Sequence, residues 1–90
     1  MTLKWYHNAK IGEVGSYEDN ERGRDKVRSL AYICGDSITV GFENREAAIK
    51  WANEYGYCKH CDSARKGEAC ILCSREINHV EVKEVSSVLA

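Results

Sequence analysis

Four of the five cysteines in this chain lie in two CxxC pairs, and no other feature constrains the fold as strongly. Cys58 and Cys61 form the first pair, Cys70 and Cys73 form the second, and eight residues separate the pairs. A CxxC turn places two sulfur atoms on the same side of a tight bend, and two such turns facing one another complete a tetrahedron of thiolates. Zinc accepts four thiolates in this geometry, with bonds of about 2.3 Å. The spacing therefore predicts one structural zinc ion held by all four cysteines.

The segment 57–74 resembles the zinc-ribbon and zinc-knuckle class of metal modules. The resemblance covers this segment only, and it implies a rigid knuckle around a metal ion without indicating a particular family. Between the two pairs stand the residues DSARKGEA. They are long enough for a small hairpin, which we expect to turn near Lys66 and Gly67.

Two other chemistries also use cysteine pairs. Rubredoxin-like iron sites combine two CxxC turns, but a glycine usually follows the second cysteine of each turn, and Asp62 and Ser74 stand there in this chain. A single CxxC can be a thioredoxin-type redox pair, although here each pair has a partner pair nearby. A small iron-binding or redox protein therefore remains an alternative to zinc.

The overall charge provides no electrostatic attraction to nucleic acid or to anionic membranes. Lys and Arg number 13, Asp and Glu number 14, and the formal net charge is -1. The cysteine region is nevertheless mildly basic. Its cations are candidate contacts for a nucleic acid or another partner: Lys59, His60, Arg65, Lys66 and Arg75. Because four thiolates and one divalent ion leave a net negative centre, these cations also offset its charge.

Chain length and thiol chemistry together indicate a small cytoplasmic protein. A chain of 90 residues is near the lower limit for a self-sufficient core, so a metal staple would be useful. We expect one domain over residues 1–90, with a body at 1–56, the knuckle at 57–74, and the last strand and tail at 75–90. No secretory signal is visible, and no segment has the roughly 20 apolar residues of a membrane span. Cytosolic thiols stay reduced, which favours a metal site over disulfides.

Alternation of apolar and polar residues predicts several short strands. Residues 2–7 form the first strand, and residues 26–42 form a hairpin that turns at the dipeptide Gly35-Asp36. Residues 77–85 form the last strand, and a loose tail follows at 86–90. The intervening stretch 8–26 is rich in glycine and charge, which is typical of a long loop, and the sequence indicates no role for it.

One amphipathic helix is predicted between Asn44 and Tyr55. Asn44 suits the N-cap position, and Gly56 suits the left-handed conformation that often ends a helix. Four residues recur at helical spacing and should cover the sheet: Ala48, Trp51, Ala52 and Tyr55. The fold class that follows is α+β. We expect a small antiparallel sheet of three or four strands, one main helix across it, and the zinc knuckle between the helix and the last strand.

Nothing in the sequence assembles a catalytic site. Four protein ligands close a zinc site, whereas catalytic zinc keeps one position open for water. The chain has no GxxxxGK, HExxH or GxSxG motif, and neither His7 nor His79 has an acid or a nucleophile at a suitable spacing. We therefore predict a protein that is not an enzyme and that has no small-molecule substrate and no membrane partner.

Two binding functions of different classes follow. The first is a regulatory or interaction module, in which zinc holds a rigid knuckle and the protein docks on a larger macromolecule, most plausibly another protein. Balanced charge favours this function. The second is nucleic-acid binding, in which the basic residues of the knuckle contact phosphates and Trp5, Tyr6 or Tyr57 stacks on bases. Compactness and the lack of targeting signals lead us to expect a bacterial or phage protein.

Overall fold

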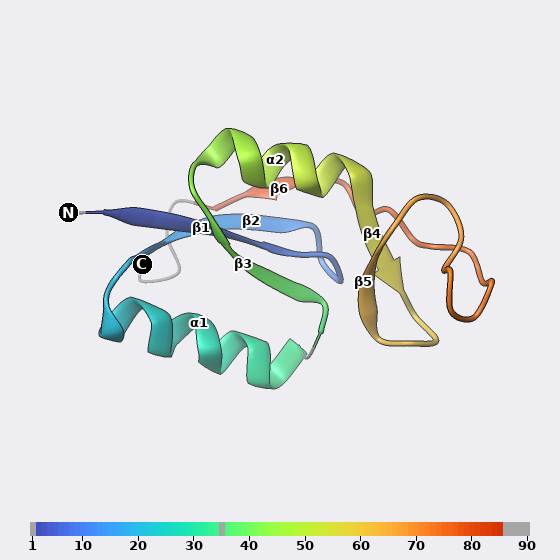
Figure 1. The fold of residues 1–90 in the computed structure, drawn as a ribbon, viewed down its shortest axis with the longest axis horizontal. Helices are drawn as coiled ribbons and strands as arrows, with labels where there is room; N and C mark the ends of the chain where they lie inside the picture. The colour runs from blue at the N-terminus through green and yellow to red at the C-terminus, as the bar shows by residue number, and fades with distance from the viewer. Residues whose placement is uncertain (1, 35, 86–90) are drawn as a thin grey trace.

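The computed structural model describes residues 2–34 and 36–85, and these residues form two helices and two small sheets (Figure 1). The fold class is α+β, as predicted, but with two helices where the sequence indicated one. In chain order the elements are β1 (Leu3–Asn8), β2 (Glu13–Glu18), α1 (Glu21–Cys34), β3 (Ile38–Phe42), α2 (Arg45–Glu54), β4 (Tyr55–Cys58), β5 (Ser63–Lys66) and β6 (Lys83–Glu84).

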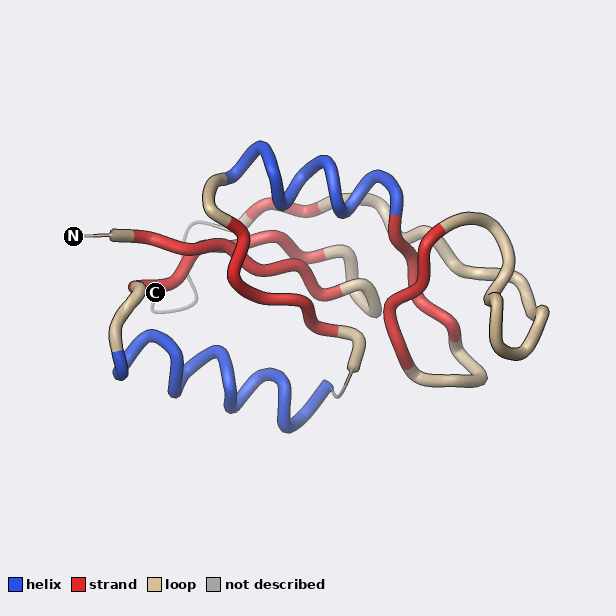
Figure 2. The backbone as a smooth tube through the Cα atoms, in the orientation of Figure 1, coloured by secondary structure: helices blue, strands red, loops and turns tan. Residues whose placement is uncertain are grey.

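The larger sheet has the strand order β3-β1-β2-β6. β1 pairs antiparallel with both β2 and β3, whereas β6 pairs parallel with β2, so the sheet is mixed and not wholly antiparallel. β4 and β5 form a separate antiparallel hairpin beside this sheet (Figure 2). Neither described helix is long and apolar enough to cross a membrane.

The two helices lie on opposite faces of the larger sheet (Figure 1). Successive residues of a strand point to opposite faces, so β1 can supply both cores at once. Tyr6 of β1 packs with Tyr17 of β2 and with Val27 of α1. Trp5 packs on the other face, in a cluster that includes Val14 and the α2 residue Ala48. Each face of β1 therefore has a helical cover.

The predictions for β1 and α2 are confirmed. Asn44 is the N-cap of α2, and its side-chain oxygen accepts a hydrogen bond of 2.8 Å from the amide of Ala47. The role predicted for Gly56 is wrong, because the chain leaves the helix at Tyr55 in an extended conformation and continues directly into β4. Gly56 is needed for packing instead. A Cβ atom there would lie 2.6 Å from the carbonyl oxygen of Asn78.

The predicted loop 8–26 is wrong, since it contains β2 and the first turns of α1. Two glycines that are typical of a loop lie instead within a strand and a helix. Gly15 lies within β2, where a Cβ atom would meet the ring of Tyr6 at 2.7 Å, so this glycine makes room for an aromatic side chain. Gly23 lies in the first turn of α1, and its amide donates a 2.8 Å hydrogen bond to the side chain of Asn20. Asn20 therefore opens a helix that the sequence reading missed.

The predicted hairpin at 26–42 is also wrong in its first half. Residues 26–34 belong to α1, and β3 pairs with β1 rather than with them. Val27 and Leu30 are three residues apart and both pack on the Tyr6 and Tyr17 cluster, which is helical spacing. The turn residue Gly35 lies outside the described residues.

The last strand is shorter than the predicted 77–85, and the tail predicted at 86–90 lies outside the described residues. Within the described part of the chain, residues 77–82 contribute only a bridge between Asn78 and Tyr57, and the ladder with β2 begins at Lys83. Backbone hydrogen bonds from Lys83 to Gly12 and from Val85 to Val14 attach this segment to the sheet.

Burial of His7 predicts acid sensitivity of the body. His7 is 2% exposed, its Nδ1 atom has no hydrogen-bond partner among the described residues, and burial lowers its pKa to about 4. The unfolded chain has a histidine pKa near about 6.5. Between these values the unfolded state binds more protons, so the free energy of unfolding must fall as the pH falls from about 6.5 towards 4.

The measurement is urea unfolding of the wild type and of His7→Gln at about pH 7 and about pH 5. We expect the variant to lose less stability between the two pH values than the wild type does. His79→Gln changes an exposed histidine and should leave the pH dependence unchanged. Equal pH dependence in the wild type and in His7→Gln would contradict the prediction. Protonation of cysteines affects all three proteins alike and therefore cancels in the comparison.

Candidate metal centre

The first cysteine pair is the turn of the β4–β5 hairpin. Cys58 lies opposite Ser63 in the ladder, and the amide of Asp62 closes the turn by donating a 2.7 Å hydrogen bond to the carbonyl oxygen of Cys58. The turn predicted at Lys66 and Gly67 is therefore wrong. Gly67, with φ 90°, bends the chain after β5, and its amide donates to a carbonyl at the end of α2.

The second cysteine pair forms a loop with the same closure. The amide of Ser74 donates a 2.8 Å hydrogen bond to the carbonyl oxygen of Cys70, and the amide of Cys70 donates to the carbonyl oxygen of Arg75. A bridge between Ala69 and Glu76 holds the base of the loop together. The two CxxC loops thus have equivalent backbone hydrogen bonds, although they differ in every residue except cysteine.

The residue after each pair adopts a left-handed backbone conformation. Asp62 has φ 54° and Ser74 has φ 62°, values that favour glycine because other residues meet a steric cost there. The loops therefore have the geometry for which glycine is usual, without having glycine. The missing glycines consequently do not distinguish a zinc site from an iron site, contrary to the sequence interpretation.

The four sulfur atoms lie together in space. All of them are within 4.8 Å of one another, with 3.5 Å between the sulfurs of Cys58 and Cys73 and 3.8 Å between those of Cys61 and Cys70. A tetrahedral ion with metal–sulfur bonds of about 2.3 Å requires sulfur–sulfur distances of about 3.8 Å. Disulfide sulfurs are about 2.05 Å apart, so these are free thiols. The quartet could hold one metal ion.

Burial differs between the two members of each pair. Cys58 and Cys70, the first members, are 0% and 1% exposed and pack against the buried side chain of Ile77, whereas Cys61 and Cys73 are partly exposed. An ion bound by all four would therefore be shielded from one side by Ile77. This burial couples the metal centre to the segment that follows the second loop.

Hydrogen bonds and burial act in opposite directions on the thiols. The amide of Cys61 donates to the sulfur of Cys58 over 3.5 Å. Backbone donation from Cys73 lowers the pKa of the Cys70 thiol to about 6, whereas burial raises the pKa of the Cys61 thiol to about 12. Because a metal ligand must be a thiolate, metal binding to the quartet would release the protons of its thiols.

Backbone pairing attaches the cysteine region to the segment that follows it and to the body. Tyr57 and Asn78 exchange two backbone hydrogen bonds of 2.8 and 2.9 Å, and the amide of Ala64 donates to the carbonyl oxygen of Asp36. The hydroxyl group of Tyr57 donates to the carboxylate of Asp62, which raises the pKa of Tyr57 to about 12. The first loop is thus braced from inside its own hairpin.

The predicted contact residues lie in different environments. Lys59, His60, Lys66 and Arg75 are exposed, whereas Arg65 is partly buried and donates to the carbonyl oxygen of Ala64. Their contacts with a partner remain a prediction. The sequence interpretation missed two exposed apolar residues: Ile71 is 90% exposed and Leu72 is 72% exposed, between the cysteines of the second pair. Their position between two ligands was the available signal, because an intervening residue of a short loop points outward.

Relief of backbone strain at Ser74 should stabilise the second loop. A residue other than glycine in the left-handed conformation destabilises the folded state by about 1 kcal/mol, and glycine removes this strain. Glycine also makes the unfolded chain more flexible, which offsets part of that gain. Ser74→Gly should therefore raise the free energy of unfolding of the loop by about 0.5 kcal/mol, read from hydrogen exchange of the Cys73 and Ser74 amides. Ser74→Val, which cannot adopt this conformation easily, should lower it. Faster exchange in Ser74→Gly would contradict the prediction.

Comparison with known proteins identifies no family for this chain. No family model matches the chain, no curated protein matches it, and no solved structure matches its fold. The resemblance to zinc ribbons and zinc knuckles therefore remains that of one motif. The chain is an α+β protein with a four-cysteine cluster whose geometry fits a metal ion.

Proposed function

We propose that this protein is a non-enzymatic zinc-binding interaction protein of the cytoplasm, where thiols stay reduced. The observation that supports it best is the sulfur quartet, with every pair of sulfurs within 4.8 Å. Four sulfur ligands fill a tetrahedral shell and leave no position for a reacting water. The ion would then stabilise the loops instead of performing chemistry.

Zinc is the ion we propose, because it accepts four thiolates tetrahedrally and needs no redox partner. Elemental analysis of the purified protein should return one zinc per chain, and the protein should be colourless. A reddish colour together with iron in the analysis would show that the bound metal is iron in a rubredoxin-like centre and not zinc. Absence of every transition metal from a well-folded protein would refute the proposal.

The partner we propose is a protein rather than a nucleic acid. Ile71 and Leu72 are adjacent, large and apolar, and they are 90% and 72% exposed. Exposed apolar side chains can be covered by a protein partner, but they add nothing to phosphate binding. The alternative, nucleic-acid binding, uses the basic residues of the knuckle, which are exposed except for the partly buried Arg65: Lys59, His60, Arg65, Lys66 and Arg75. Phosphate binding weakens steeply with salt through counterion release. Retention of single-stranded DNA at about 50 mM salt, lost at about 200 mM, would therefore favour that alternative.

A further inference from the structure

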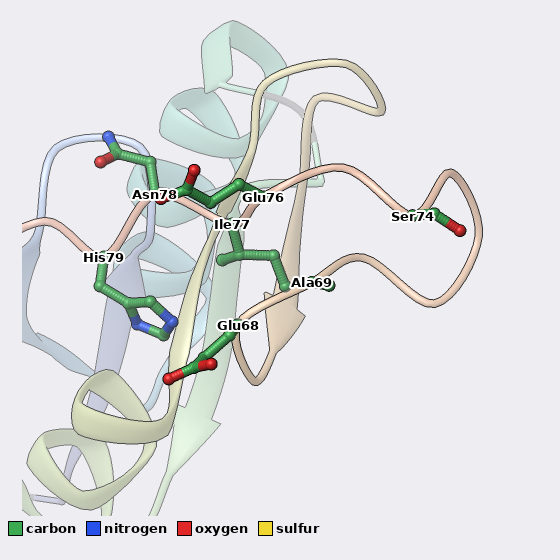
Figure 3. A pocket seen from close by; sticks show the side chains of 7 residues that line it. All are labelled: Glu68, Ala69, Ser74, Glu76, Ile77, Asn78 and His79. Carbon is green, nitrogen blue, oxygen red and sulfur yellow. The ribbon is translucent and has the colours of Figure 1, made fainter.

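A groove of about 740 Å³ lies beside the second cysteine loop (Figure 3). It is built from the two chain segments that lead into and out of that loop, which are joined by a 2.8 Å hydrogen bond from the amide of Ile77 to the carbonyl oxygen of Glu68. Seven residues line it: Glu68, Ala69, Ser74, Glu76, Ile77, Asn78 and His79. Because the loop joins both segments, the shape of the groove depends on the metal quartet.

The groove is acidic. Glu68 and Glu76 are exposed and extend on either side of Ile77 in the close-up, and none of the described lining residues is Lys or Arg (Figure 3). His79 is held by a 2.6 Å hydrogen bond between its Nε2 atom and the carbonyl oxygen of Gly67. Arg75 stands between the lining residues Ser74 and Glu76 in the sequence but does not line the groove. Two carboxylates in a groove that no described Lys or Arg lines attract a positively charged segment and repel phosphate groups.

The exposed apolar pair lies in the loop that joins the two segments of this groove. Ile71 and Leu72 belong to the loop that Cys70 and Cys73 close, and Ser74, which lines the groove, follows Cys73 directly. We call the apolar pair and the two groove carboxylates together the knuckle surface. It combines apolar anchors with negative charge, and both parts are carried by one metal-stabilised element.

We propose that the knuckle surface binds a basic amphipathic segment of a partner protein. Apolar side chains of that segment would cover Ile71 and Leu72, and its Lys or Arg side chains would pair with Glu68 and Glu76. This inference rests on the proposed function and names the chemistry of its partner. A second copy of the chain fits less well, because a two-fold symmetric contact would place the carboxylates of one knuckle surface against those of the other. The carboxylates argue against nucleic acid and anionic lipid.

The test uses the full-length, zinc-loaded protein labelled with ¹⁵N. The probe is a synthetic helical peptide of about 14 Leu and Lys residues, and its matched control has Glu in place of every Lys. We expect saturable amide shifts confined to residues 68–79 with the basic peptide, and binding at least about tenfold weaker with the acidic one. Equal binding of both peptides, or shifts confined to α1, would overturn the inference.

Substitutions separate the two halves of the knuckle surface. Ile71→Ser with Leu72→Ser, and separately Glu68→Gln with Glu76→Gln, should each weaken binding of the basic peptide at least about tenfold while the zinc content stays at the wild-type level. Val40→Ser and Glu46→Gln change an exposed apolar and an exposed acidic residue away from the groove, and should leave the affinity unchanged. If the glutamine variants bind the peptide like the wild type, the charge complementarity is refuted.

Failure of this inference is distinguishable from failure of the proposed function. The zinc-loaded protein could bind neither peptide, nor oligothymidylate, nor vesicles with anionic phospholipid. That result would overturn the proposed basic partner, but the proposal of a non-enzymatic zinc-binding protein would stand. Binding of oligothymidylate that Lys59→Ala weakens would instead overturn the choice of a protein partner. Vesicle binding that Ile71→Ser with Leu72→Ser abolishes would assign the same apolar pair to a membrane, and would overturn the inference.

Discussion

Cys58→Ser is expected to abolish stoichiometric metal binding and to unfold residues 57–83, while β1, β3 and α2 keep their structure. Structural zinc sites supply about 10–16 kcal/mol of binding free energy, and removal of one thiolate takes away a large part of it. Cys58 is also 0% exposed, so its replacement leaves a buried hydroxyl group beside Ile77. Hydrogen exchange is the measurement: amides of residues 57–83 should lose protection, and those of α2 should retain it.

Chelation provides the matched comparison for this variant. Removal of the ion from the wild type should produce the same exchange pattern, and Ser74→Gly, which keeps all four thiols, should retain the ion. Unchanged protection after complete metal removal would show that the loops fold without the ion. Unfolding of the whole chain would refute the predicted division into a body at 1–56 and a knuckle at 57–74, since the body would then depend on the metal.

Gly23→Ala is expected to lower the free energy of unfolding by about 2 kcal/mol or more, although alanine is the better helix former by about 1 kcal/mol. Gly23 lies in the first turn of α1, where a Cβ atom would be 2.8 Å from the carbonyl carbon of Glu18 and nearer still to its oxygen. Backbone atoms cannot move aside as a flexible side chain can. The start of α1 must therefore shift away from the end of β2.

Urea unfolding measures this effect, and Ser29→Ala is its control in the same helix. Ser29 is exposed, so its replacement should change stability by no more than about 0.5 kcal/mol. A Gly23→Ala protein as stable as the wild type, or more stable, would show that helix propensity outweighs the close approach of α1 to β2. The sign of the change in the free energy of unfolding of Gly23→Ala therefore shows whether helix propensity or the contact between α1 and β2 dominates.

The sequence predicted the elements whose determining contacts are local, and it missed those that depend on residues distant in the chain. α2 was predictable because its cap at Asn44 and its apolar stripe are local, and β1 because it alternates over a few residues. α1 was not, because Gly23 in a charged stretch is typical of a loop until Glu18 is known to lie against it. β2 was missed for the same reason at Gly15, whose partner Tyr6 comes from another strand.

The cysteine spacing by itself predicted the four-sulfur site, because each CxxC loop is closed by hydrogen bonds within its own few residues and so brings its own two sulfurs together. Only the tertiary structure decided what surrounds that site. It placed Glu68 and Glu76 on the two segments of one groove and left Ile71 and Leu72 uncovered in the loop that joins those segments. The physical reason is range: a loop encodes its own hydrogen bonds, whereas burial and exposure depend on which distant segments pack nearby.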